Sequence, residues 1–125
     1  MKRILLSGYF GFDNAGDELI LKSIIELLRS ENKELEIVVL SKEPLKTANM
    51  YNVHSVNRWS PISVIRAIAT SKIVISAGGL FQDLTGTLSL YYYLALIVIS
   101  KLFGKKIVLY GVEFAPENID LIDIY

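Results

Sequence analysis

Short apolar runs alternate along the chain with longer segments of helical periodicity. Five apolar runs predict strands, at residues 3–7, 36–40, 53–56, 72–76 and 106–110. Three segments repeat apolar residues at helical spacing and predict helices, at residues 16–30, 62–69 and 88–103. Pro44 is predicted to open a loop, and the acidic tail from Glu113 fits neither a strand nor a helix.

Strands that read as continuous apolar runs are typical of a parallel sheet covered on both faces. With right-handed crossovers, the pattern predicts an α/β fold with a doubly wound, mostly parallel open sheet of about five strands, which is Rossmann-like. No linker or internal repeat divides the sequence. We therefore expect residues 1–125 to form a single domain.

The composition excludes several classes of function. The 125 residues hold 13 basic and 13 acidic side chains, no cysteine and one histidine. Without a basic excess, a nucleic-acid partner is not expected. Without cysteine there is no disulfide, thiolate catalyst or zinc finger, and one histidine leaves little room for a transition metal. We expect no metal and no cofactor.

The longest apolar stretch, residues 88–103, is shorter than a membrane-spanning helix, and Lys101 interrupts it. It shows little of the polar face of a membrane-surface helix, so we expect it to pack against the sheet or a partner domain. The first residues lack the apolar length of a signal peptide. We expect a cytoplasmic protein, with peripheral contact at the inner face of the membrane left open.

The two most unusual segments, residues 8–18 and 77–86, follow the first and fourth predicted strands. In open α/β sheets, ligands bind outside the carboxyl ends of the strands where the strand order reverses. If these two strands are neighbours, both segments begin at the same edge of the sheet. The sequence therefore predicts a binding crevice between them.

The first segment does not match a nucleotide-binding loop. Its glycines, at positions 8, 11 and 16, miss the dinucleotide spacing, and Asp17 and Glu18 would repel a phosphate at the start of the helix. Asp13 and Asn14 are candidates for binding hydroxyl-rich groups. In the alternative interpretation, Asn14 only caps the helix, with Asp17 as its partner.

The second segment contains Asp83, which is the only acidic residue between positions 61 and 110. It lies beside Gln82 and follows the turn Gly78–Gly79. A carboxylate here could accept hydrogen bonds from sugar hydroxyls or act as a general base. Alternatively, it caps the helix that follows.

Two long runs resemble one family. The runs GYFGFDNAGDELIL (8–21) and VISAGGLFQDLTGTLSLYYY (74–93) resemble the N-terminal half of polysaccharide pyruvyl transferases of the CsaB type. Ala77 stands where the family pattern has the first of three glycines, and residues 111–116 differ from its later glycine-rich segment. The resemblance covers residues 1 to about 116.

The resemblance implies transfer of the pyruvyl group of phosphoenolpyruvate to a hydroxyl pair on a lipid-linked cell-wall saccharide, forming a ketal and releasing phosphate. It also implies a two-domain GT-B architecture in which residues 1–125 are the N-terminal half of the cleft, with the second domain absent from this chain. The cations that bind phosphoenolpyruvate are then expected in that second domain, and this chain alone is expected to be inactive.

Carried onto this sequence, the resemblance gives a set of site residues. Asp83 and Asp13 are the expected catalytic residues, either one acting as the base. The expected substrate-binding residues are Gly8, Asn14, Asp17, Gly78, Gly79 and Gln82. Two alternatives remain open, namely half of a GT-B glycosyltransferase and a non-catalytic α/β interaction module, and a nicotinamide-binding domain is the weakest reading.

Overall fold

The computed structural model describes residues 2–77, 87–110 and 121–124, and the side chains of 2–77 and 91–109. Within these residues the strands are β1 (Arg3–Ser7), β2 (Glu36–Ser41), β3 (His54–Asn57), β4 (Ile73–Ala77), β5 (Lys106–Tyr110) and β6 (Leu121–Ile124). The helices are α1 (Ala15–Glu31), α2 (Pro44–Tyr51), α3 (Pro61–Thr70) and α4 (Thr87–Leu102).

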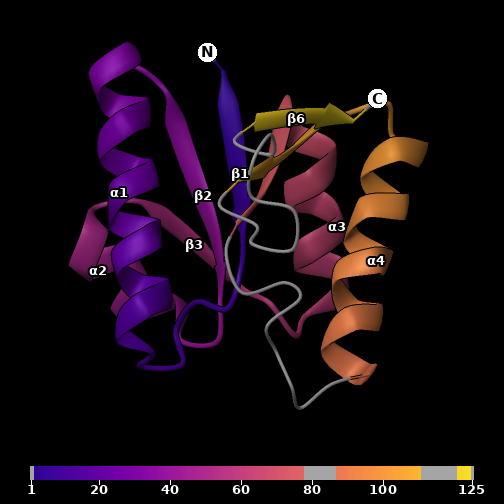
Figure 1. The fold of residues 1–125 in the computed structure, drawn as a ribbon, viewed down its shortest axis with the longest axis horizontal. Coiled ribbons are helices and arrows are strands. Elements are labelled where there is room, and N and C mark those ends of the chain that lie inside the picture. Colours follow the sequence, from indigo (N-terminus) through magenta and orange to yellow (C-terminus); the bar gives the residue numbers. More distant parts are fainter. Residues whose placement is uncertain (1, 78–86, 111–120, 125) are drawn as a thin grey trace.

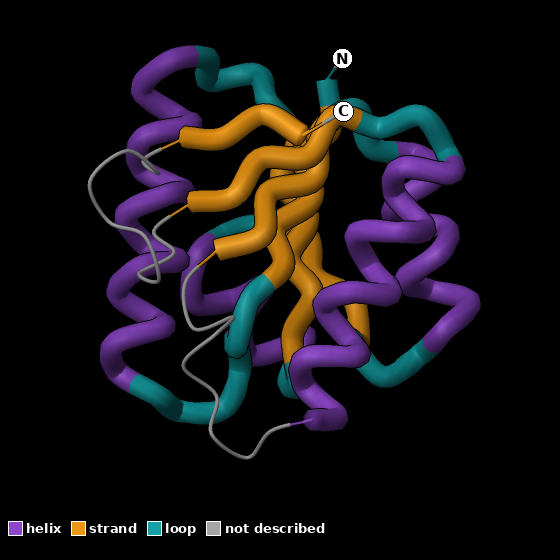
Figure 2. The backbone as a smooth tube through the Cα atoms, turned by 45° about the vertical axis from the view of Figure 1, so that its right-hand side comes forward, coloured by secondary structure: helices purple, strands orange, loops and turns teal. Residues whose placement is uncertain are grey.

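The strands form one sheet in the order β3-β2-β1-β4-β5-β6. Strands β1 to β5 are parallel, and β6 runs antiparallel to β5. Helices cover both faces, with α1 and α2 on one side and α3 and α4 on the other (Figures 1 and 2). The predicted Rossmann-like, mostly parallel α/β sheet is confirmed, and each predicted strand and helix lies within one residue of its observed bounds.

The loop predicted from Pro44 was wrong, and the acidic tail, which the sequence does not clearly assign to a strand or a helix, contains a strand. The segment from Pro44 is the helix α2, where proline lies in the first turn, a position that its fixed φ suits. This helix has only 8 residues and buries only Thr47, so it lacks the row of buried apolar residues found in α1 and α3. In the acidic tail, residues Leu121–Ile124 form β6, which is set by backbone pairing with β5 and is too short to show a pattern.

Alternate side chains of the central strands enter two separate cores. Ile4 and Leu6 of β1 pack with α1, whereas Leu5 between them packs with α3 and α4. This follows from the twofold alternation of side chains along a strand. The central strands β1, β2 and β4 each place side chains in both cores, so both helical layers depend on them.

Helix α4 packs against the sheet with only one of its faces. Tyr93 and Leu96 are buried in the core, while Tyr91, Leu94 and Val98 are exposed. Packing against the sheet, as expected for this apolar helix, is confirmed for the buried face. No helix among the described residues combines the length and the apolar character needed to cross a bilayer.

Replacing Leu6 by alanine is expected to destabilise the fold by about 2–5 kcal/mol, because the side chain is fully buried and its removal leaves a cavity. Leu45→Ala removes the same atoms from a side chain that is 81% exposed, and should change the free energy of unfolding by less than about 0.5 kcal/mol. Urea unfolding of both variants measures the difference. Equal effects would contradict this assignment of the core.

Candidate functional site

The loops after β1 and β4 begin at the same edge of the sheet. The two strands pair in register, with Ser7 opposite Ser76 at their carboxyl ends. This confirms the expectation that the first and fourth strands are neighbours. Gly78, Gly79, Gln82 and Asp83 lie outside the described residues, so their position relative to Asp13 stays a prediction.

The loop after β1 packs tightly against its neighbours. A side chain at Gly8 would lie only 2.8 Å from the carbonyl oxygen of Ala77 and would overlap the ring of Phe10. At Gly11, where φ is +87°, a side chain would overlap the Ser41 hydroxyl and lie 2.8 Å from the Lys42 amide nitrogen. Both glycines therefore allow the loop to contact the ends of the adjacent strands β4 and β2.

Glu18, from the first turn of α1, holds this loop from the other side. Its carboxylate accepts a hydrogen bond from the Gly11 amide at 2.9 Å and another from the Tyr51 hydroxyl at 2.7 Å. Burial, together with the hydrogen bond to Glu18, raises the pKa of Tyr51 well above its ordinary value, so the phenol remains a donor. Tyr51, at the end of α2, could not be linked to the site from the sequence, because that segment was predicted to be a loop.

Asn14 is the N-cap of α1. Its side-chain oxygen accepts a hydrogen bond from the Asp17 amide at 3.1 Å, which satisfies one of the free donors of the first turn. The capping interpretation of Asn14 is therefore confirmed, and the binding of a substrate by Asn14 or Asp17 stays a prediction.

Asp13 lies in the left-handed region, with φ at +59°, and its side chain is exposed. Its carboxylate accepts a hydrogen bond from Lys46 at 2.7 Å. That bond, together with the charge of Lys46, lowers the pKa of Asp13 below its ordinary value. Asp13 is therefore held in its ionised form, which makes it a weaker proton acceptor than an unpaired carboxylate.

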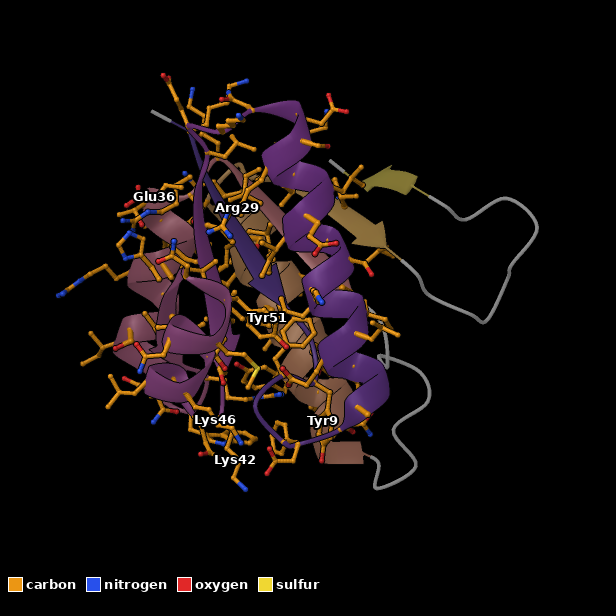
Figure 3. The ribbon with its side chains drawn as sticks, turned by 90° about the vertical axis from the view of Figure 1, so that its left-hand side faces the viewer. Tyr9, Arg29, Glu36, Lys42, Lys46 and Tyr51 are labelled. Carbon is orange, nitrogen blue, oxygen red and sulfur yellow. The ribbon has the colours of Figure 1, made fainter. Side chains whose placement is uncertain are left out.

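Three basic residues lie at or beside this edge, on segments that the sequence analysis did not assign to the site. Figure 3 shows Lys42 and Lys46 with Tyr9 at one end of the molecule. Lys42 follows β2 and lies 5.3 Å from the ring centre of Phe12. Arg58 follows β3. Each of Lys42 and Arg58 stands directly after a strand end, which is the signal by which the sequence could have revealed them.

Arg58 is only 2% exposed and donates a hydrogen bond to the Gly8 carbonyl at 3.0 Å. Its guanidinium lies near five aromatic rings, and the nearest centre, that of Tyr92, is 4.5 Å away. Its Nε is buried without a hydrogen-bond partner in the described part of the chain. From its position after β3, Arg58 therefore holds the start of the loop between β1 and α1. It does so by a hydrogen bond to Gly8 and by cation–π contacts with Tyr9 and Phe12.

The edge combines an ionised carboxylate, exposed lysines and aromatic rings. This set can bind hydroxyl-bearing and anionic groups through hydrogen bonds and charge. Among the residues that the structure describes, no three acidic or histidine side chains come together as metal ligands.

The family model described as polysaccharide pyruvyl transferase matches residues 14–122. A search of curated proteins found no match. Among solved structures, the chain is similar to a sugar N-formyltransferase from Shewanella sp FDAARGOS_354, with 12% identity and a TM-score of 0.44. That alignment covers 87% of this chain and 38% of the formyltransferase chain.

Gly11→Ala is expected to destabilise the chain by about 1–3 kcal/mol, because alanine is strained at positive φ and its methyl group overlaps the end of β2. Gly16→Ala is the matched control. Its methyl group meets only the Asn14 side chain at 3.4 Å, so its effect should lie within about 1 kcal/mol and favour the helix. Thermal unfolding measures both, and equal destabilisation would contradict the tight packing of the loop.

Lys46→Met is expected to raise the pKa of Asp13 toward its ordinary value of 3.8, because it removes the hydrogen bond and the charge that lower it. Since the folded-state pKa lies below the unfolded one, the ion pair stabilises the chain above pH 3.8. That contribution is lost as the pH falls through the lowered pKa. An NMR titration of the Asp13 carboxyl tests this, with Lys33→Met as a control that should leave the pKa in place.

Proposed function

The chain belongs to the polysaccharide pyruvyl transferase family, and on that premise we propose that it forms the N-terminal half of an enzyme that transfers the pyruvyl group of phosphoenolpyruvate to a saccharide. The observation that carries the proposal is the family match over residues 14–122, which runs from the helix cap after β1 to the last strand. It therefore includes the whole segment after β4, where Asp83 lies. The adjacent carboxyl ends of β1 and β4 support a site at that edge.

The proposed reaction converts a hydroxyl pair and phosphoenolpyruvate into a cyclic ketal and phosphate. The methylene carbon of the enol phosphate gains a proton from an acid of the enzyme, and the first hydroxyl oxygen bonds to the neighbouring carbon as that hydroxyl gives its proton to a base of the enzyme. The bond between this carbon and the bridging oxygen of the phosphate then breaks. The second hydroxyl oxygen bonds to the same carbon and closes the ring, and its proton passes to the departing phosphate. The enzyme must supply an acid for the methylene carbon, a base for the first hydroxyl, and positive charge for the phosphate and carboxylate.

We assign the base to Asp83 and acceptor binding to Asp13. The Lys46 hydrogen bond lowers the pKa of Asp13, which suits a hydroxyl-binding carboxylate better than a proton acceptor. In this proposal the remaining substrate-binding positions border the same crevice; they are Gly8, Asn14, Asp17, Gly78, Gly79 and Gln82. Lys42 is exposed beside them, which supports a role in attracting the anionic donor.

In this proposal the chain acts together with a second domain and on an acceptor at the membrane. A second Rossmann-like domain closes the cleft in a GT-B arrangement and carries the other cations for phosphoenolpyruvate. The acceptor is a lipid-linked cell-wall saccharide that the enzyme meets in the cytoplasm, at the inner face of the membrane.

The test measures phosphate release from phosphoenolpyruvate, together with the mass gain of a pyruvyl ketal on the saccharide. It uses the protein that carries this chain with its second domain. Asp83→Asn is expected to lower kcat by about 10²- to 10⁴-fold, as loss of a general base does. Asp13→Asn should chiefly raise KM for the saccharide. Glu34→Gln, an exposed change in the turn after α1, is the matched control.

Three outcomes would contradict the proposal. Turnover of a nucleotide-sugar in place of phosphoenolpyruvate would indicate a glycosyltransferase. Full activity in both aspartate variants would place the chemistry elsewhere and leave this chain as a binding module. Steady phosphate release by the 125-residue chain alone would contradict the need for a second domain.

A further inference from the structure

Exposed apolar side chains form a continuous stripe along the outer side of α4. They are Tyr91, Leu94, Val98 and Leu102, spaced three or four residues apart, and Leu102 is 78% exposed. This spacing puts them on one side of the helix. The opposite side, which includes Tyr93, is the part that packs on the sheet. The stripe therefore has no partner in the described part of this chain.

Helix α3 extends this apolar surface. The two helices lie side by side on the same face of the sheet (Figure 1), and Ile62 and Ile65 of α3 are exposed. Between the helices lies an apolar hollow of about 270 Å³, bordered by Trp59 and Tyr92 at one end and Ile99 at the other. We call this surface the α3–α4 face and define it by its six exposed residues: Ile62, Ile65, Tyr91, Leu94, Val98 and Leu102.

The charges around the α3–α4 face have one sign. Arg66 on α3 and Lys101 on α4 are exposed, and Lys105 follows α4. Lys105 donates a hydrogen bond from its ammonium to the Ala69 carbonyl at 3.0 Å, which holds it against the end of α3. Within residues 58–77 and 87–110 there is no aspartate or glutamate. By contrast, the α1 and α2 side carries acidic and basic side chains together.

We propose that the α3–α4 face docks on the surface of an anionic lipid bilayer. Its apolar residues enter the boundary between headgroups and acyl chains, and its bases contact lipid phosphates. Because the face extends along both helices, α3 and α4 lie flat on the surface. Helix α4 needs no polar face of its own for this, because the side opposite its exposed apolar residues packs on the sheet. This inference deepens the proposed function, which places the enzyme at the inner face of the membrane, and rests on it for that location. Vesicle binding is measured without the transferase reaction, so the two can fail separately.

The charges of the α3–α4 face favour a lipid bilayer over a second copy of the chain as its partner. Pairing two such faces would bring Arg66 and Lys101 of each copy toward bases of the other, with no carboxylate among the described residues of the face to compensate. An uncharged apolar partner would leave the same bases without a counter-charge. An anionic membrane can bury the apolar side chains of the face and also supply negative charge to its bases.

The test is sedimentation of the 125-residue chain with lipid vesicles. The chain should bind vesicles that contain phosphatidylglycerol much more strongly than vesicles of pure phosphatidylcholine, and added salt should weaken the binding. Val98→Glu and Lys101→Glu should each lower the partition coefficient roughly tenfold or more, because each places a negative charge at the lipid surface. Both positions are exposed, and circular dichroism checks that each variant is folded.

Leu45→Glu and Lys22→Glu are the matched controls, since they make the same changes at exposed positions on α2 and α1, across the sheet. Both should leave vesicle binding unchanged. Equal loss in the controls, or equal binding to neutral vesicles, would overturn the proposal. So would a lipid-free dimer that Val98→Glu dissociates, because it would assign the face to a second copy.

Discussion

Hydrogen bonds from three directions hold the loop between β1 and α1, and the position of Asp13 depends on them. The Glu18 carboxylate accepts from the Gly11 amide, Arg58 donates to the Gly8 carbonyl, and the Lys42 amide donates to the Phe10 carbonyl at 3.1 Å. The three partners come from α1 and from the ends of β3 and β2. A loop fixed in this way presents Asp13 at the edge without the conformational entropy that a free loop would lose on binding.

Local patterns allowed most of the fold to be predicted from the sequence. The strands follow from continuous apolar runs, and α1, α3 and α4 follow from apolar residues at helical spacing. Helix α2 and strand β6 were missed because both are short, and β6 is determined by its pairing with β5. The order of β1 and β4 was an inference from topology, which pairing confirms.

The candidate site was predicted less completely than the fold. The first loop was identified by its glycines, and the cap at Asn14 by residue type. The position of Arg58 after a strand could have been noticed, but its contact with Gly8 spans 50 positions and could not be derived. The contact of Tyr51 with Glu18, across 33 positions, could not be derived either. Such contacts exist only once the sheet is assembled. The pairing of Asp13 with Lys46 was missed for the same reason, although it lowers the pKa of that aspartate.

The hydrogen bond between Arg58 and Gly8 and the ion pair between Asp13 and Lys46 differ in their exposure to water. Arg58 is enclosed by aromatic rings and by the protein, so dissolved ions scarcely weaken its attraction for the Gly8 carbonyl. The Asp13–Lys46 pair is exposed, with 72% of the Asp13 side chain accessible, and electrolyte screens it strongly. The loop thus has an anchored inner part and an adjustable outer part, and a charged molecule arriving at the edge can displace Lys46 from Asp13 while the backbone beneath keeps its shape.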